Sequence, residues 1–230
     1  MTESQQNAGL VGELHWSDWA QRRASVAVPQ RTSILSKPLT AQIIQTHKPD
    51  CEILDIGAGN DLLKTALNAL GFRGRYDTLD IDPQVGATYR SINEVDRKYD
   101  AIAMLEVIEH LRIEITLDYL EQMHSILNPG GLMIISTPDP SHPTWFWEDI
   151  SHVQHYPYRD FVAILGIKGY RDVRVYRIVA FPKLEKYPVL VRDVVSRTGM
   201  VFRNLLSRLS GVNFESTTLV FVAQRKSPKP

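Results

Sequence analysis

Hydrophobic and polar positions along this chain switch between two periods, which predicts strands that alternate with helices. Short apolar runs typical of buried parallel strands occupy residues 52–56, 75–81, 101–105 and 132–136. Apolar residues at spacings of three and four, typical of amphipathic helices, follow at residues 62–70 and 114–127. Two further β-rich runs lie at residues 171–180 and 217–224. This alternation predicts an α/β fold with helices on both faces of a mostly parallel sheet.

The chain outside this core divides into an N-terminal extension, a compressed segment and a tail. Residues 1–45 have a polar start followed by a helical pattern, so they are predicted to form a helical extension. The domain proper is expected over residues 46–225, with a frayed tail at residues 226–230. The segment between residues 83 and 99 is short for the helix and strand that such a fold usually has there, so we expect only a stub strand at residues 87–92.

Residues 181–211 separate the last two predicted strands, where a short turn would be enough, so we interpret them as a helical insertion. Basic residues outnumber acidic ones within it. Its apolar residues recur at helical spacing: Val194, Val195, Met200, Val201, Leu205, Leu206 and Leu209. Three interpretations stay open, namely a cap over the active site, the face of a homodimer, and a helix that lies on an anionic membrane.

The most informative local pattern is a strand, a tight turn and a helix around Gly57 and Gly59. Glycine permits positive φ and lets a ligand approach bare backbone, and the helix that follows offers free N–H groups. Asp80 ends the next strand, where a carboxylate can bind a ribose diol. Leu62 stands where a dinucleotide fingerprint requires a third glycine, which argues against a pyrophosphate. Asp55, inside the first strand, can receive an ammonium group but would repel a phosphate.

This segment resembles the first motif of class I S-adenosylmethionine (SAM) methyltransferases. The resemblance continues in the same order over about residues 50–180, through the strand end at Asp80, residues 99–106 and residues 127–138. It implies an enzyme that uses SAM and is built on a Rossmann-like sheet of seven strands, the last one antiparallel. The residues that it places against SAM are Asp55, Gly57, Ala58, Gly59, Asp80, Ile81 and Leu105.

A cluster of acids and histidines is expected at the same edge of the sheet. Glu106, Glu109 and His110 lie where the strand at residues 101–105 ends and a helix is expected to begin, so all three would face one way. Open α/β folds bind ligands at this edge. Carboxylates at a helix N-terminus also have a simpler explanation, because they interact favourably with the helix dipole. A second histidine pair, His152 and His155, follows the strand at residues 132–136 and borders the same pocket.

The E-x-x-E-H motif at residues 106–110 resembles two groups of O-methyltransferases, those of the ubiquinone pathway and those that methylate the 3′-terminal 2′-hydroxyl of small RNAs. In the RNA group, this motif joins a later histidine in a divalent-metal site. His152, with Tyr156 and Phe161 after it, fits the spacing of that histidine. The ligands implied by the resemblance are Glu106, Glu109, His110 and His152.

The candidate catalytic histidines are His110, His152 and His155. His155 is a rival fourth ligand, and the alternatives for it are a general base and a residue of the pocket wall. If no metal takes part, His110 or His155 is the candidate general base. A site of mixed carboxylates and imidazoles suits Mn²⁺, Fe²⁺, Co²⁺ or Zn²⁺ better than Mg²⁺. A Lewis acid at this place would lower the pKa of an acceptor hydroxyl and orient it through a neighbouring oxygen. This chemistry indicates an acceptor with two adjacent oxygens.

Composition limits the setting in which this chemistry takes place. A formal net charge of zero gives no electrostatic reason to expect a nucleic-acid partner. The single cysteine, Cys51, excludes a disulfide framework and fits a reducing compartment. Because the N-terminal residues are polar and no apolar run reaches the length of a membrane span, we expect one cytoplasmic domain.

The sequence therefore predicts a SAM-dependent O-methyltransferase, metal-assisted, that acts on a hydroxyl of a small molecule or glycan with adjacent oxygens. An RNA 3′-terminal ribose 2′-O-methyltransferase stays open because the insertion at residues 181–211 is basic. A non-catalytic SAM-fold interaction subunit is the alternative from another class, although the intact motifs argue against it. The missing third glycine argues against a nicotinamide-dependent dehydrogenase.

Overall fold

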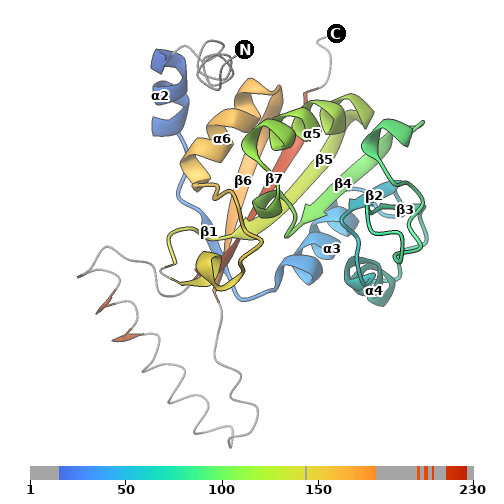
Figure 1. The fold of residues 1–230 in the computed structure, drawn as a ribbon, viewed down its shortest axis with the longest axis horizontal. Helices are drawn as coiled ribbons and strands as arrows, with labels where there is room; N and C mark the ends of the chain where they lie inside the picture. Colours follow the sequence, from blue (N-terminus) through green and yellow to red (C-terminus); the bar gives the residue numbers. More distant parts are fainter. Residues whose placement is uncertain are drawn as a thin grey trace, which may run out of the picture.

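The computed structural model describes residues 16–142, 144–179, 201, 202, 205, 206, 209 and 216–226. Its centre is a seven-stranded sheet in the order β1-β6-β7-β5-β4-β2-β3 (Figure 1). The strands are β1 (Gln30–Thr32), β2 (Ile53–Ile56), β3 (Tyr76–Leu79), β4 (Tyr99–Leu105), β5 (Leu127–Pro138), β6 (Tyr170–Val179) and β7 (Ser216–Arg225). Neighbouring strands pair in parallel, except that β7 is antiparallel to both β5 and β6. The predicted α/β class, mostly parallel with an antiparallel last strand, is confirmed.

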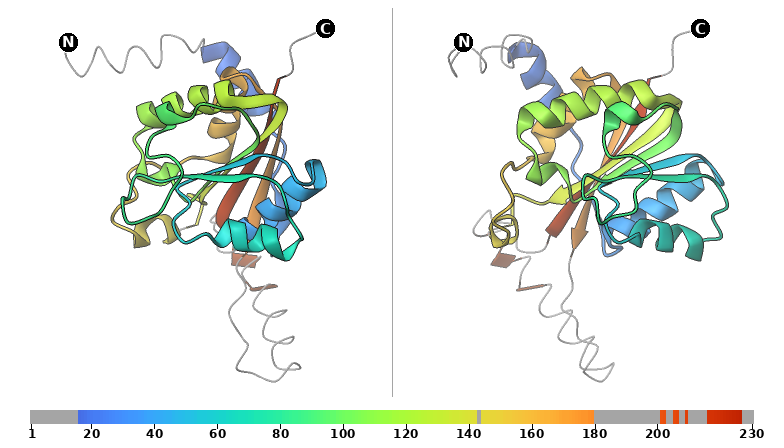
Figure 2. Two further views of the ribbon diagram at one scale, coloured as in Figure 1. Left: turned by 90° about the vertical axis from the view of Figure 1, so that its right-hand side faces the viewer. Right: turned by 45° about the vertical axis from the view of Figure 1, so that its right-hand side comes forward.

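Helices cover both faces of this sheet (Figures 1 and 2). The α-helices are α2 (Trp16–Ala24), α3 (Ser36–His47), α4 (Leu62–Ala69), α5 (Ile113–Ile126) and α6 (Tyr158–Ile167). Short 3₁₀ turns are η1 (Ile92–Glu94), η2 (Ile108–His110) and η3 (Trp145–Glu148). One hydrophobic core packs α5 and α6 against the sheet, and a second packs α3 and α4 against the opposite face.

Alternation along the central strands divides their side chains between these two cores. Leu54 on β2 and Ile102 on β4 belong to the core beneath α5 and α6, whereas Ile53 and Ala103 belong to the core beneath α3 and α4. Successive side chains on a strand point to opposite faces, so a strand covered on both faces is apolar throughout. This is why the strands could be identified as continuous apolar runs.

The stub strand expected at residues 87–92 is absent from the described sheet, so this expectation is wrong. Residues 87–92 contribute only an isolated bridge between Leu79 and Tyr89, because the short segment leaves no room for a crossover helix and a strand. The sheet is completed instead by β1, which lies inside the N-terminal extension that was predicted to be helical. The β1 strand pairs with Tyr176–Ile178 of β6. Pro29 directly precedes β1, and a proline there disfavours a continuous helix.

The direction of α3 determines which of its ends faces the candidate site. Lys48, just after α3, forms an ion pair with Asp100 at the start of β4, with 2.7 Å between Nζ and Oδ2. The C-terminal end of α3 therefore lies at the edge where the parallel strands begin. Its first turn, at Ser36 and Lys37, lies toward the edge where β2 and β4 end.

The predicted insertion at residues 181–211 falls largely outside the described residues. The residues described within it are all helical: 201, 202, 205, 206 and 209. Val201, Phe202, Leu205 and Leu209 are exposed. The cap, dimer and membrane interpretations stay predictions. Within the described part of the chain, no helix is both long and apolar enough to cross a bilayer.

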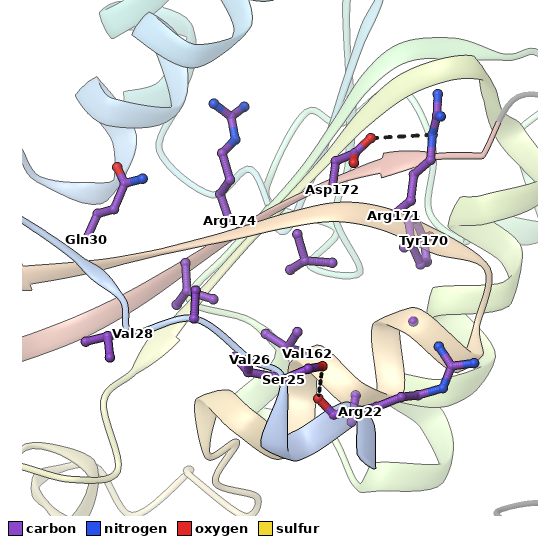
Figure 3. Close-up of a pocket in the computed structure, with 15 residues that line it drawn as sticks. Arg22, Ser25, Val26, Val28, Gln30, Val162, Tyr170, Arg171, Asp172 and Arg174 are labelled. Carbon is purple, nitrogen blue, oxygen red and sulfur yellow. Dashed lines mark hydrogen bonds and ion pairs between the residues drawn. The ribbon is translucent and has the colours of Figure 1, made fainter. Parts of the chain in front are cut away.

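A cavity of about 390 Å³ lies between α2, α6 and the first half of β6. Figure 3 shows that Arg22 approaches it from α2 and that Arg171 and Arg174 extend from β6. The cavity borders the beginning of β6, whereas the glycine turn follows the end of β2. Because β2 and β6 run in the same direction, this cavity and the predicted SAM site lie toward opposite edges of the sheet.

Candidate active site

The glycine turn after β2 has a backbone that requires glycine. Gly57 and Gly59 have φ values of +73° and +52°, in the left-handed region. A Cβ on Gly57 would come within 2.4 Å of Cγ2 of Val107, so a larger residue does not fit without movement. Asp61, at the N-cap of α4, makes no side-chain capping hydrogen bond. The Gly57 N–H donates to the Leu79 carbonyl oxygen, so the N–H groups that this segment offers at the sheet edge are those of the uncapped first turn of α4.

Asp80 is held directly beside this turn. Its Oδ2 accepts a hydrogen bond from the Gly59 N–H at 3.1 Å, and its Oδ1 accepts one from the Asp82 N–H at 2.9 Å. Each carboxylate oxygen has a second lone pair, so Asp80 can still accept hydrogen bonds from a ribose diol. Among the other residues predicted to contact SAM, Ala58 and Leu105 are buried and Ile81 is exposed.

Asp55 lies inside β2 and is 4% exposed. Burial raises the pKa of this carboxyl to about 7, although the Tyr76 hydroxyl donates a hydrogen bond to Oδ2 at 2.5 Å and opposes the rise. The charge of Lys37, in the first turn of α3, also lowers the pKa values of Asp55 and Glu106. Lys37 was missed by sequence reasoning, which assigned no residue of the N-terminal extension to the site. The sequence Ser36-Lys37-Pro38 is typical of a helix start, and α3 does begin there. The position of this helix start near the edge of the sheet could not be predicted from the sequence.

The E-x-x-E-H motif does not lie on one helix, so the expected common helical face is wrong. The α5 helix begins only at Ile113, and Glu106 has a φ of +57° directly after β4. Ser136 on β5 stabilises this turn: the Glu106 N–H donates to the Ser136 carbonyl oxygen at 3.0 Å, and the Ser136 hydroxyl donates to Glu106 Oε1 at 2.6 Å. Non-glycine residues with positive φ are frequent at functional sites.

The structure brings together three of the four predicted metal ligands. One ligand atom each from Glu109, His110 and His152 lie within 4.8 Å of one another. The two imidazole centroids are 4.9 Å apart, and His110 Nε2 is 4.0 Å from Glu109 Oε1. The Glu106 carboxylate is outside this group and is bound to Ser136 instead. His155 is exposed and is also outside the group, so its role as a rival ligand or base stays a prediction.

Glu109 is a buried carboxylate for which the described residues provide no cationic partner at ion-pair distance other than the His110 ring, should that ring be protonated. Its side chain is 1% exposed. Its Oε2 and the nearby Thr137 hydroxyl are both buried, and neither has a hydrogen bond of normal geometry within the described residues. Burial and the charge of Glu106 raise the pKa of Glu109 to about 8. A buried carboxylate is stable in its charged form only when it is paired, so this environment fits a cation.

His152 is oriented as a ligand by a backbone acceptor. Its Nδ1 lies 2.7 Å from the carbonyl oxygen of Phe146. A carbonyl oxygen only accepts hydrogen bonds, so Nδ1 carries the proton and Nε2 keeps its lone pair. Histidines that bind metals in proteins commonly donate their other N–H in this way.

The loop that carries His152 is anchored at both ends and in its middle. Asp139, just after β5, forms a buried ion pair with Arg177 of β6, with 2.8 Å between Oδ2 and Nε. Near the other end, the buried hydroxyls of Tyr156 and Thr116 are 2.7 Å apart. In between, the N–H groups of Val153 and Gln154 donate to the Glu109 carbonyl oxygen at 2.8 and 3.1 Å. The loop is therefore attached directly to the η2 turn that carries Glu109 and His110.

This fold and this arrangement of residues define a class of protein. Residues 20–174 match the family model described as a methyltransferase domain, which is more than half of the chain. The chain belongs to this methyltransferase family. The family also supports SAM as the methyl donor, as the glycine turn and Asp80 suggest.

Individual relatives agree with this assignment. The chain is 28% identical over 138 residues to a ubiquinone biosynthesis O-methyltransferase of Rickettsia felis, covering 52% of this chain and 56% of the relative. A protein of the same name from Ruegeria pomeroyi is 30% identical over 131 residues, covering 47% of this chain and 52% of the relative. The chain thus spans about half the length of these curated relatives. Among solved structures, a SAM-dependent methyltransferase from Archaeoglobus fulgidus superposes with a TM-score of 0.61 at 17% identity, covering 83% of this chain and 95% of that one.

Proposed function

We propose that this protein is a SAM-dependent O-methyltransferase that uses a divalent cation to prepare a hydroxyl on a small molecule or glycan with two adjacent oxygens. The observation that carries the proposal is the convergence of ligand atoms of Glu109, His110 and His152 within 4.8 Å. Glu109 is buried, and among the described residues its Oε2 has no hydrogen bond of normal geometry. Relatives named ubiquinone biosynthesis O-methyltransferase support transfer to oxygen.

SAM would lie across the carboxyl ends of β2, β3 and β4. Asp80 would bind the ribose diol, and the glycine turn would let the methionine portion approach the uncapped N–H groups at the start of α4. Asp55 would attract the ammonium group of SAM, and binding of that cation would bring the pKa of Asp55 down from about 7. Lys37 acts electrostatically on both Asp55 and Glu106, so it is well placed to bind the carboxylate of SAM.

Glu109, His110 and His152 would bind the cation, with Glu106 as the predicted fourth ligand. When bound, the cation supplies Lewis acidity toward two adjacent acceptor oxygens. Glu109 contributes the negative charge, and its buried position makes this charge costly unless a cation is present. The imidazoles contribute neutral nitrogen ligands, and the Phe146 carbonyl keeps the His152 lone pair on Nε2. His155, exposed on the same loop, is the proposed general base, because histidine exchanges a proton near neutral pH.

The test is methyl transfer from radiolabelled SAM to a panel of acceptors. The panel should include a catechol, a monophenol, a vicinal sugar diol and an RNA oligonucleotide with a free 3′-terminal diol. We expect transfer to an acceptor with adjacent oxygens, and loss of at least tenfold in rate for Glu109→Gln and His152→Ala. His47→Ala, an exposed histidine at the end of α3, is the matched control and should keep full activity. Transfer that is unaffected by Glu109→Gln and His152→Ala would refute the role of the cluster.

A further inference from the structure

A chain of hydrogen bonds leads from an exposed carboxylate to His110. The Ser151 hydroxyl donates to Asp149 Oδ1 at 2.6 Å. A carboxylate at neutral pH only accepts hydrogen bonds, so the hydroxyl proton lies on the Asp149 side. The Ser151 Oγ is also 3.0 Å from His110 Nδ1. Because its own proton is used, Oγ can only accept there, and His110 Nδ1 must carry a proton.

The same carboxylate also shapes the turn that presents His152. Asp149 Oδ1 accepts a second hydrogen bond, from the Ser151 N–H at 2.8 Å, and the Asp149 carbonyl oxygen accepts one from the His152 N–H at 3.2 Å. One residue therefore holds both the hydroxyl that contacts His110 and the backbone that carries His152. In the neutral imidazole the remaining nitrogen of His110, Nε2, carries the lone pair, and it lies 4.0 Å from Glu109 Oε1.

We infer that Asp149 and Ser151 are positioning residues that keep His110 in its Nδ1–H tautomer, so that the Nε2 lone pair converges with Glu109 and His152. The inference rests on the proposed function for the purpose of this convergence, which is to bind a divalent cation. Outer carboxylates that orient ligating histidines commonly affect metal affinity about 10- to 100-fold.

One simpler explanation has to be separated from this inference. The Ser151 carbonyl oxygen is 3.2 Å from the same His110 Nδ1, and it is also a pure acceptor. If the carbonyl alone determined the tautomer, removal of the hydroxyl or of the carboxylate would leave His110 unchanged. Because Asp149 and Ser151 are both exposed, they can be replaced with little effect on the core.

The direct test is ¹⁵N NMR of the histidine rings in protein freed of metal by chelation, at a pH where the rings are neutral. In the unmodified protein, both His110 and His152 should show the Nδ1–H tautomer. Ser151→Ala and Asp149→Ala should each shift His110 toward a mixture of tautomers. His152 should not change in the Ser151→Ala protein, because the Phe146 carbonyl still accepts its Nδ1–H.

Two further variants separate hydrogen bonding from charge. Asp149→Asn keeps a carbonyl oxygen that can accept from the Ser151 hydroxyl, so it should preserve the His110 tautomer. Glu148→Gln removes the same charge one residue away. In the described part of the chain the Glu148 carboxylate accepts a hydrogen bond from the Thr144 hydroxyl at 3.1 Å, so this variant should behave like the parent. A His110 tautomer that is unchanged in both Ser151→Ala and Asp149→Ala would overturn the inference in favour of the carbonyl alone.

Titration calorimetry with Mn²⁺ gives a second readout that does not depend on turnover. We expect about 10- to 100-fold weaker Mn²⁺ binding by Ser151→Ala, with SAM affinity unchanged. Ser151→Ala is the deciding variant, because Asp149 Oδ2 also lies 3.9 Å from His152 Nε2 and its charge acts on the site directly. Equal Mn²⁺ affinity in Ser151→Ala and the parent would also overturn the inference. If the parent itself binds no Mn²⁺, the metal-assisted function fails, and the tautomers measured without metal still decide whether Asp149 and Ser151 position His110.

Discussion

Glu109→Gln should raise the free energy of unfolding relative to the parent at high pH without metal, and lower it when Mn²⁺ is bound. In metal-free protein, Glu109 has its pKa raised from 4.5 to about 8, so the folded state binds more protons than the unfolded state between these values. The stability contributed by this group is therefore fully present below about pH 4.5 and is lost as the pH rises toward 8. At 1.36 kcal/mol per pKa unit, the interval corresponds to at most about 5 kcal/mol. Glutamine is neutral at every pH and does not show this loss.

The assay is urea unfolding of both proteins at pH 5 and at pH 8.5, after chelation and then with saturating Mn²⁺. Taking the difference between parent and variant cancels groups that do not interact with Glu109, such as Asp55, whereas the coupled Glu106 contributes to the difference. Without metal, we expect the variant to gain stability relative to the parent by a few kcal/mol between the two pH values. With Mn²⁺, the parent should regain the advantage at pH 8.5, because the cation stabilises the charged carboxylate. A difference that stays constant with pH, or that Mn²⁺ does not change, would refute the reasoning.

Three other perturbations test separate parts of the structure. Asp80→Ala should weaken SAM binding by about 1.5–3 kcal/mol in calorimetry, as expected for hydrogen bonds to a charged group, and unchanged affinity would mean that the ribose lies elsewhere. Gly57→Ala should lower the free energy of unfolding by about 2–4 kcal/mol, because it combines positive φ with a contact to Val107; a loss below 0.5 kcal/mol would contradict the rigid turn. Replacing residues 181–211 with a short Gly/Ser linker should leave SAM affinity intact but impair turnover, and an unchanged Michaelis constant and turnover would show that the segment is dispensable.

The sheet and the glycine turn could be predicted because their signals are local. Buried strands such as Ile53–Ile56 read as apolar runs, and Gly57 and Gly59 mark a backbone that other residues rarely adopt. The β1 strand could not be predicted in this way. Its three residues pair with Tyr176–Ile178, far away in the sequence, and only the folded chain brings the two segments together.

The site shows the same division between local and long-range information. The resemblance to metal-dependent O-methyltransferases suggested a cluster of Glu109, His110 and His152, and the structure brings their ligand atoms together. The conformation of Glu106 was missed, because its left-handed turn depends on hydrogen bonds to Ser136 on the neighbouring strand. A glutamate at residue 106, taken alone, is typical of a helix start. The pairing of β4 with β5 places Glu106 beside Ser136, and the hydrogen bonds to Ser136 stabilise the sharp turn.

The metal site itself is best tested by anomalous X-ray diffraction from crystals grown with SAM and Mn²⁺. We expect one strong manganese peak within about 2.0–2.3 Å of a Glu109 carboxylate oxygen and of the Nε2 atoms of His110 and His152, distances typical of divalent transition-metal ligands. A crystal with SAM bound and Mn²⁺ in excess, but without a manganese peak between these three side chains, would contradict the proposed metal-assisted transfer.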